Sequence, residues 1–176
     1  MTPAKSAERQ YRVRRGRAWF DAELREAHRR WHVGVPAFLR HSSVANLLSA
    51  PLIYSLSVPF VLLDVWVTLY QWICFPVYRV ALVPRRPFFV VDRHKLEYLN
   101  TIEKVNCAYC GYVNGLIAYT REIAARTEQY WCPIRHARPV QGAHDRYRHF
   151  ADYGDAAGYR RGLATRRRAL EPCKPI

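Results

Sequence analysis

Three cysteines and one histidine form two short clusters of the kind that binds a metal ion. Two residues separate Cys107 from Cys110, and three residues separate Cys132 from His136. Zinc is usually bound by four such side chains in a tetrahedral arrangement, and each short cluster supplies two of them. We therefore predict a Cys3His site at these four residues, with zinc as the favoured metal and iron or copper as alternatives.

The first cluster lies on a segment that is predicted to be helical. Residues 93–130 contain no proline, which favours one long helix or two helices in line. Glu103, Cys107, Cys110 and Asn114 follow one another at steps of four, three and four, so they share one helix face. Metal or redox chemistry would suit this face. So would plain helix packing, in which cysteine acts as a small apolar residue.

A continuous helix would keep the two clusters apart. The 21 residues between Cys110 and Cys132 would span about 30 Å as a helix. A site within one chain therefore requires a break near Gly111, Asn114 or Gly115, and an antiparallel dimer is the alternative. Four polar residues are predicted to support the metal ligands or to replace one of them: Glu103, Asn114, Glu122 and Glu128.

A long apolar block precedes this helix. Asp64 and Arg79 are the only charged residues between positions 42 and 83, and a membrane-spanning helix needs about 20 apolar residues. Because Pro59 lies near the centre of the block, we predict a membrane hairpin of two helices, residues 44–58 and 60–80. A single span over about 52–73 and a buried hairpin in a soluble all-α protein are the alternatives.

Asp64 is unusual in this block, because an ionised carboxylate in lipid is costly unless it is paired or functional. We predict that it is buried in the membrane, with Arg79 or the basic N-terminal segment as its partner. The other interpretation is that Asp64 caps a helix or lies at the depth of the lipid headgroups.

The chain is strongly basic, with a formal net charge of +14. Both flanks of the apolar block are positive, which predicts that both termini are cytoplasmic, in a bacterial inner membrane. The expected partners are anionic lipids, with nucleic acid as a weaker candidate. Five arginines near the C-terminus would bind the anionic surface: Arg160, Arg161, Arg166, Arg167 and Arg168.

These features predict a mostly α protein that combines a membrane-associated helical hairpin with a small helical cytoplasmic domain. The predicted segments are a basic disordered arm (1–17), an amphipathic interface helix (18–41), the hydrophobic hairpin (42–83) and a basic helical domain with the Cys/His cluster (84–176). Gly111 and Gly115 have a spacing that favours close helix packing, so they could mediate self-association or contact with another membrane protein.

The leading functional interpretation is a non-enzymatic, membrane-anchored accessory or scaffold protein with a bound metal. A redox-active membrane enzyme subunit that uses the same thiols or metal is the first alternative. A soluble nucleic-acid-binding protein that uses the basic tail is the second.

Overall fold

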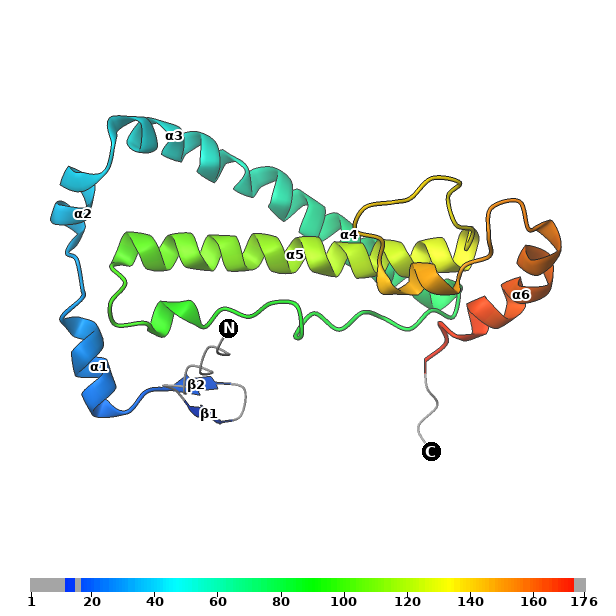
Figure 1. Cartoon of the computed structure of the whole chain (residues 1–176), viewed down its shortest axis with the longest axis horizontal. Helices are drawn as coiled ribbons and strands as arrows, with labels where there is room; N and C mark the ends of the chain where they lie inside the picture. The colour runs from blue at the N-terminus through cyan, green and yellow to red at the C-terminus, as the bar shows by residue number, and fades with distance from the viewer. Residues whose placement is uncertain (1–11, 15–16, 173–176) are drawn as a thin grey trace, which may run out of the picture. The chain divides into compact units, whose positions relative to one another are not determined.

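The computed structural model describes residues 12–14 and 17–172 and is mostly helical, as predicted. In chain order, its elements are β1 (Arg12–Arg14), β2 (Arg17–Trp19), α1 (Ala22–Arg29), α2 (Val35–His41), α3 (Val44–Ser55), α4 (Ser57–Val77), η1 (Arg93–Lys95), α5 (Thr101–Trp131), η2 (Asp145–His149) and α6 (Ala156–Arg168), as Figure 1 shows. The strands β1 and β2 pair antiparallel. The predicted arm, residues 1–17, lies largely outside the described residues.

The chain divides into two compact units, which are considered separately. The first unit contains the chain up to Leu52 together with Val90–Tyr112. The second contains Ile53–Phe89 and the chain from Val113 onward. The beginning of α5 therefore belongs to the first unit, and the remainder of α5 belongs to the second.

In the first unit, two short helices occupy the region of the predicted interface helix. The interface helix predicted over 18–41 is interrupted, because α1 ends at Arg29, and α2 follows after Gly34 with a proline in its first turn. The His28 ring lies between two aromatic rings, with centroid distances of 5.2 Å to Phe20 and 5.3 Å to Tyr98. These edge contacts attach α1 to the segment that precedes α5.

A reciprocal cap begins α5. The Asn100 N–H donates to Glu103 Oε2 at 2.9 Å, and the Glu103 N–H donates to Asn100 Oδ1 at 3.0 Å. This exchange satisfies two backbone donors at the helix start. The Asn100 side chain also donates to the Val33 carbonyl at 3.2 Å. The carboxylate of Glu103, which we predicted to support a metal, therefore has a role in starting the helix.

The apolar block contains one candidate membrane span. It covers Val44–Val77, 34 residues with a mean hydropathy of 1.9 in its most apolar part. The predicted hairpin is not confirmed. Pro59, where we expected the chain to turn, is the third residue of α4. A proline is tolerated in the first turn of a helix, because the N–H groups there have no partner within the helix.

In the second unit, α4 and α5 enclose a core together with the chain that follows α4. Its buried apolar residues are Phe75, Val80, Val83, Leu116, Tyr119, Ile123, Ala125, Phe150, Ala151 and Leu170. Residues 80–89, here called the strap, have no regular secondary structure. Backbone N–H groups of the strap form hydrogen bonds with residues outside it. The Val80 N–H donates to the Phe75 carbonyl at 2.8 Å, and the Ala81 N–H donates to the Leu170 carbonyl at 2.7 Å.

Two glycines of α5 lie against the chain that follows α4. A Cβ on Gly115 would be 2.5 Å from the Phe88 carbonyl oxygen, whereas a Cβ on Gly111 would be at an ordinary 3.4 Å from the Val90 carbonyl oxygen. Gly115 is therefore needed for the close approach of the strap. The chain itself thus covers Gly115, and self-association through this pair stays a prediction.

We expect Gly115→Ala to lower the free energy of unfolding by about 1–3 kcal/mol, because the strap must move away from α5. Gly111→Ala is the matched control, and its effect should lie between zero and a gain of about 1 kcal/mol from better helix propensity. Thermal unfolding of the two variants in detergent would measure the difference. Equal destabilisation by both substitutions would contradict the close approach at Gly115.

Candidate functional site

The predicted thiol ligands lie at distant positions along α5. Cys107 is half-buried and Cys110 is exposed, both within the helix, while Cys132 directly follows the helix end at Trp131. No break occurs near Gly111, Asn114 or Gly115. None of the four cysteines that the structure describes forms a disulfide.

The described residues contain no group of three or more His, Cys, Asp or Glu side chains that could hold a metal ion. The backbone N–H of His136 donates to the Tyr147 hydroxyl at 2.6 Å, and the two rings stack at a centroid distance of 6.2 Å. Because α5 is continuous, a site that uses all four predicted ligands would need a second chain. The Cys3His site and its zinc remain a prediction with that condition attached.

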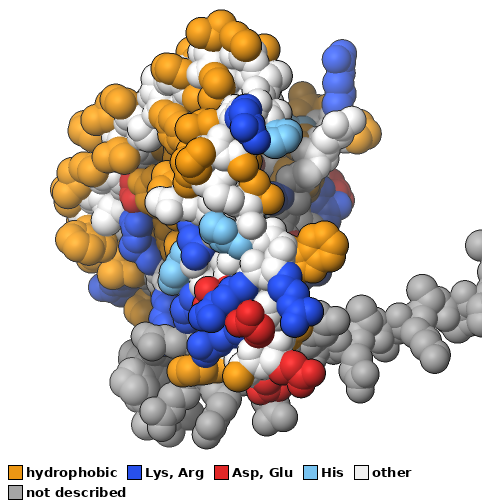
Figure 2. All heavy atoms as spheres, turned by 90° about the vertical axis from the view of Figure 1, so that its left-hand side faces the viewer, with side chains coloured by type: hydrophobic (Ala, Val, Ile, Leu, Met, Phe, Trp, Pro, Cys, Tyr) orange, Lys and Arg blue, Asp and Glu red, His pale blue; other side chains and the backbone are white. Residues whose placement is uncertain are grey.

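In the second unit, the polar face of α4 packs against the rest of the unit, and the apolar face of α4 is exposed. Asp64, Thr68 and Gln71 recur at helical spacing on the face that contacts the rest of the unit. The opposite face is exposed and apolar, and it carries Leu62, Val65, Trp66, Leu69, Trp72, Ile73 and Val77. Hydrophobic side chains also cover much of the surface that Figure 2 shows. This arrangement reverses the usual pattern of a helix at a water-exposed surface.

The partner of Asp64 is Arg85 of the strap, not Arg79 or the N-terminal segment as we expected. The guanidinium group binds both carboxylate oxygens, with Nη2 at 2.8 Å from Oδ2, and its Nη1 also donates to Thr68 Oγ1 at 3.1 Å. It lies over the rings of Phe89 and Tyr119, at 4.4 and 5.1 Å from their centroids. The hydrogen bond from Arg85 to Asp64 raises the pKa of Arg85. This ion pair neutralises the one carboxylate of the apolar block.

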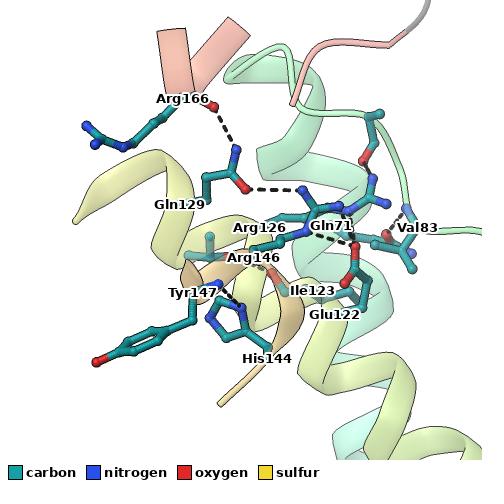
Figure 3. Close-up of polar contacts among 12 residues, drawn as sticks. Gln71, Val83, Glu122, Ile123, Arg126, Gln129, His144, Arg146, Tyr147 and Arg166 are labelled. Carbon is teal, nitrogen blue, oxygen red and sulfur yellow. Dashed lines mark hydrogen bonds and ion pairs between the residues drawn. The ribbon is translucent and has the colours of Figure 1, made fainter. Parts of the chain in front are cut away.

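Gln71 is a buried hydrogen-bonding centre that the sequence analysis missed. Its side chain is 2% exposed, donates to the hydroxyl of the fully buried Tyr119 and accepts from the Val83 N–H at 3.0 Å. Figure 3 shows the bond to Val83. The sequence did hold a signal, because Asp64, Thr68 and Gln71 are the polar stripe of an otherwise apolar helix.

A second polar cluster lies between α5 and the chain around η2 (Figure 3). The Glu122 carboxylate accepts from Arg126 Nε at 2.8 Å and from Arg146 Nη2 at 2.7 Å. Partial burial raises the pKa of Glu122, but the hydrogen bonds and charges of Arg146 and Arg126 outweigh it and hold the pKa below 4.5. Arg146 also donates to Gln129 Oε1 at 3.1 Å, and Gln129 donates to the Arg166 carbonyl at 2.8 Å. The cluster thus connects α5 to α6.

His144 lies beside this cluster and caps η2. Its Nδ1 accepts from the Tyr147 N–H at 3.1 Å, and its Nε2 lies 2.8 Å from Glu128 Oε2. With Nδ1 accepting, the ring proton is on Nε2 and is donated to Glu128. Glu122 and Glu128, which we predicted as supporting ligands, therefore both bind side chains of the η2 region. Asn114, the fourth such residue, is exposed on α5.

A cleft of about 710 Å³ opens between α5, η2 and α6. Three arginines, Arg146, Arg148 and Arg166, are part of its lining. Of the five arginines predicted to bind an anionic surface, only Arg166 lines this cleft. Arg167 is half-buried against the Tyr130 ring, and Arg160, Arg161 and Arg168 are exposed on α6. The cleft residues of η2 were missed, because their proximity to α6 depends on tertiary structure.

Stability should fall in acid as Glu122 becomes protonated. Because its pKa is below 4.5 when folded, the pairing with Arg126 and Arg146 is fully present above pH 4.5 and is lost as pH falls through the folded pKa. Glu122→Gln should lower the melting temperature at neutral pH and reduce its further fall as the pH drops below 4.5. The control is Asp152→Asn, whose carboxylate is 76% exposed beside Arg135. An unchanged acid dependence in Glu122→Gln would contradict this role.

Known protein families, curated proteins and solved structures give no match to this chain. Its function must therefore be inferred from its own residues.

Proposed function

We propose that this chain is a membrane-anchored, non-enzymatic scaffold or accessory protein, held in the bilayer by its Val44–Val77 helix. One observation carries the proposal: the most apolar part of this helix has none of its residues buried by the rest of the protein. Exposing so much apolar surface to water is unfavourable, whereas the bilayer interior removes that cost. The helix is 34 residues long, which exceeds the length of about 20 residues that a membrane span needs.

The distribution of polar groups along α4 supports a lipid contact. Membrane helices keep their ionisable side chains on the face that packs against protein, and pair them there. Asp64 is paired with Arg85 on such a face, and the exposed face of α4 has no charged side chain between Leu62 and Val77. Lipid on the exposed side of α4 would therefore meet apolar groups alone.

The charges outside the helix support an anionic membrane. Residues 1–41 contain ten Arg or Lys against four acidic residues, and residues 84–176 contain seventeen against nine. Basic residues next to a membrane helix attract anionic headgroups by about 1 kcal/mol each. In this proposal, the exposed arginines of α6, Arg160, Arg161 and Arg168, contribute to that attraction.

Membrane fractionation of the full chain tests this proposal. The wild-type protein should stay with the membranes after an alkaline wash and should require detergent for extraction. Val65→Arg should reduce the retained fraction several-fold, because an arginine in the middle of a membrane helix costs about 2.5–3.5 kcal/mol. Val140→Arg is the matched control, since Val65 is 53% exposed and Val140, in a loop, is 46% exposed.

A wild-type protein that is monodisperse in aqueous buffer without detergent would refute the membrane anchor. Equal retention of both valine variants would place the insertion elsewhere in the chain. The bound metal and the redox role remain separate proposals, and the four-ligand metal site needs residues of two chains to come together.

A further inference from the structure

The cleft between α5, η2 and α6 has the charges and the free donors of an anion site. Its lining includes three arginines, one histidine and Thr165, against the two carboxylates of Glu122 and Asp145. Glu122 is paired with Arg126 and Arg146, which both donate to its Oε1. Arg148 and Arg166 then supply two further positive charges, against the one carboxylate of Asp145.

The guanidinium group of Arg166 is fixed in position by the backbone. Its Nε donates to the His149 carbonyl at 2.9 Å, and its Nη1 donates to the Gly158 carbonyl at 3.3 Å. It passes over Gly162, where an added Cβ would be 2.2 Å from Nη1. The Nη2 group has no protein partner among the described residues, so its hydrogens are available to a ligand in the cleft.

Arg148 supplies a second donor on the η2 side. Its side chain is exposed, and its Nε donates to His149 Nε2 at 3.1 Å, which leaves both terminal nitrogens without a partner in the described part of the chain. Because His149 Nε2 accepts this bond, its ring proton is on Nδ1, where it is a further donor.

We propose that this cleft binds a phosphate-bearing anion, with Arg148 and Arg166 as the direct ligands of the phosphate. Guanidinium groups bind phosphate through paired N–H donors, and the doubly charged phosphate of a monoester fits two of them. The volume of about 710 Å³ exceeds that of a phosphate group, so the remainder of the ligand also has room. This site is independent of the membrane anchor, because none of its residues belongs to α3 or α4.

Titration calorimetry on the detergent-solubilised full chain tests the site directly. The probes are inorganic phosphate and glycerol 3-phosphate, with sulfate as a competitor. We expect saturable binding of glycerol 3-phosphate, weakened about tenfold by Arg148→Gln, the ratio typical for the loss of one charge-assisted hydrogen bond. Arg148→Lys should recover part of the loss, since it keeps the charge without the paired donors.

Arg138→Gln is the matched control, because it removes the same charge from an exposed position outside the cleft. The affinity of this variant for glycerol 3-phosphate should equal that of the wild type. Equal weakening by Arg148→Gln and Arg138→Gln would overturn the site in favour of a general charge effect. The site would also be overturned if neither the soluble probes nor nanodiscs that contain phosphatidic acid showed saturable binding.

The same phosphate could belong to a free metabolite or to a lipid headgroup. Binding to nanodiscs that contain phosphatidic acid, compared with nanodiscs of equal charge that contain phosphatidylglycerol, separates the two sources. A preference for phosphatidic acid that Arg148→Gln abolishes identifies a lipid monoester. Binding of soluble glycerol 3-phosphate without this preference identifies a free ligand. Both results support the cleft as a phosphate site.

Discussion

Replacing Gln71 with leucine is expected to lower the free energy of unfolding by about 2–4 kcal/mol, because two buried polar groups lose their partner at once. The Tyr119 hydroxyl and the Val83 N–H both bond to the Gln71 side chain, and these three residues are 0–3% exposed. Leucine has a similar volume, so the loss reports on hydrogen bonding and not on a cavity. Denaturant unfolding in detergent would measure it.

A second substitution separates the two bonds. Adding Tyr119→Phe to Gln71→Leu removes the orphaned hydroxyl and should recover about 1–2 kcal/mol, while the Val83 N–H stays unsatisfied. Tyr119→Phe alone should be destabilising, because it leaves the Gln71 amide without its acceptor. Simple additivity of the two losses would show that the residues do not interact.

The second large effect is expected at the ion pair between the strap and α4. Arg85→Met leaves the Asp64 side chain, 15% exposed, without its countercharge. Breaking a fully buried pair in this way costs about 3–5 kcal/mol. Because the Arg85 side chain is 41% exposed, we expect a smaller loss of about 2–3 kcal/mol, measured by denaturant unfolding.

The neighbouring arginine provides the control. Arg86 is exposed and lies one residue further along the strap, so Arg86→Met should change the stability by no more than about 0.5 kcal/mol. Asp64→Leu combined with Arg85→Met should restore much of the loss, since no unpaired charge remains. If the double variant were no more stable than Arg85→Met, the pair would not account for the effect.

The sequence was sufficient to predict helical content and the location of the apolar block. Both follow from local pattern, because residues 42–83 carry so few charges and residues 93–130 contain no proline. Two helices, α3 and α4, occupy the block as predicted, but whether they fold back on each other was less accessible. Pro59 indicated a turn, but a proline near a helix start is compatible with continuation, and neighbouring residues alone do not decide between these outcomes.

The candidate sites were predicted less well, because their residues meet only in the folded chain. Asp64 was identified as unusual, yet its partner Arg85 is 21 residues away on a strap without regular structure. Arg148 and Arg166 are 18 positions apart, and no local spacing links them. The cap formed by Asn100 and Glu103 was legible in the sequence, since an Asn followed three residues later by Glu is a known helix-start pattern.

The strap also has a consequence for how the protein opens. Segments without regular structure usually exchange their amide hydrogens rapidly, because local fluctuations expose them. The N–H groups of Val80 and Val83 instead bond to α4, and that of Ala81 bonds to Leu170, which follows α6. These amides should therefore be released only when the second unit unfolds as a whole. Hydrogen exchange at these three amides would then measure the global unfolding of the second unit, as exchange at the centre of a helix does.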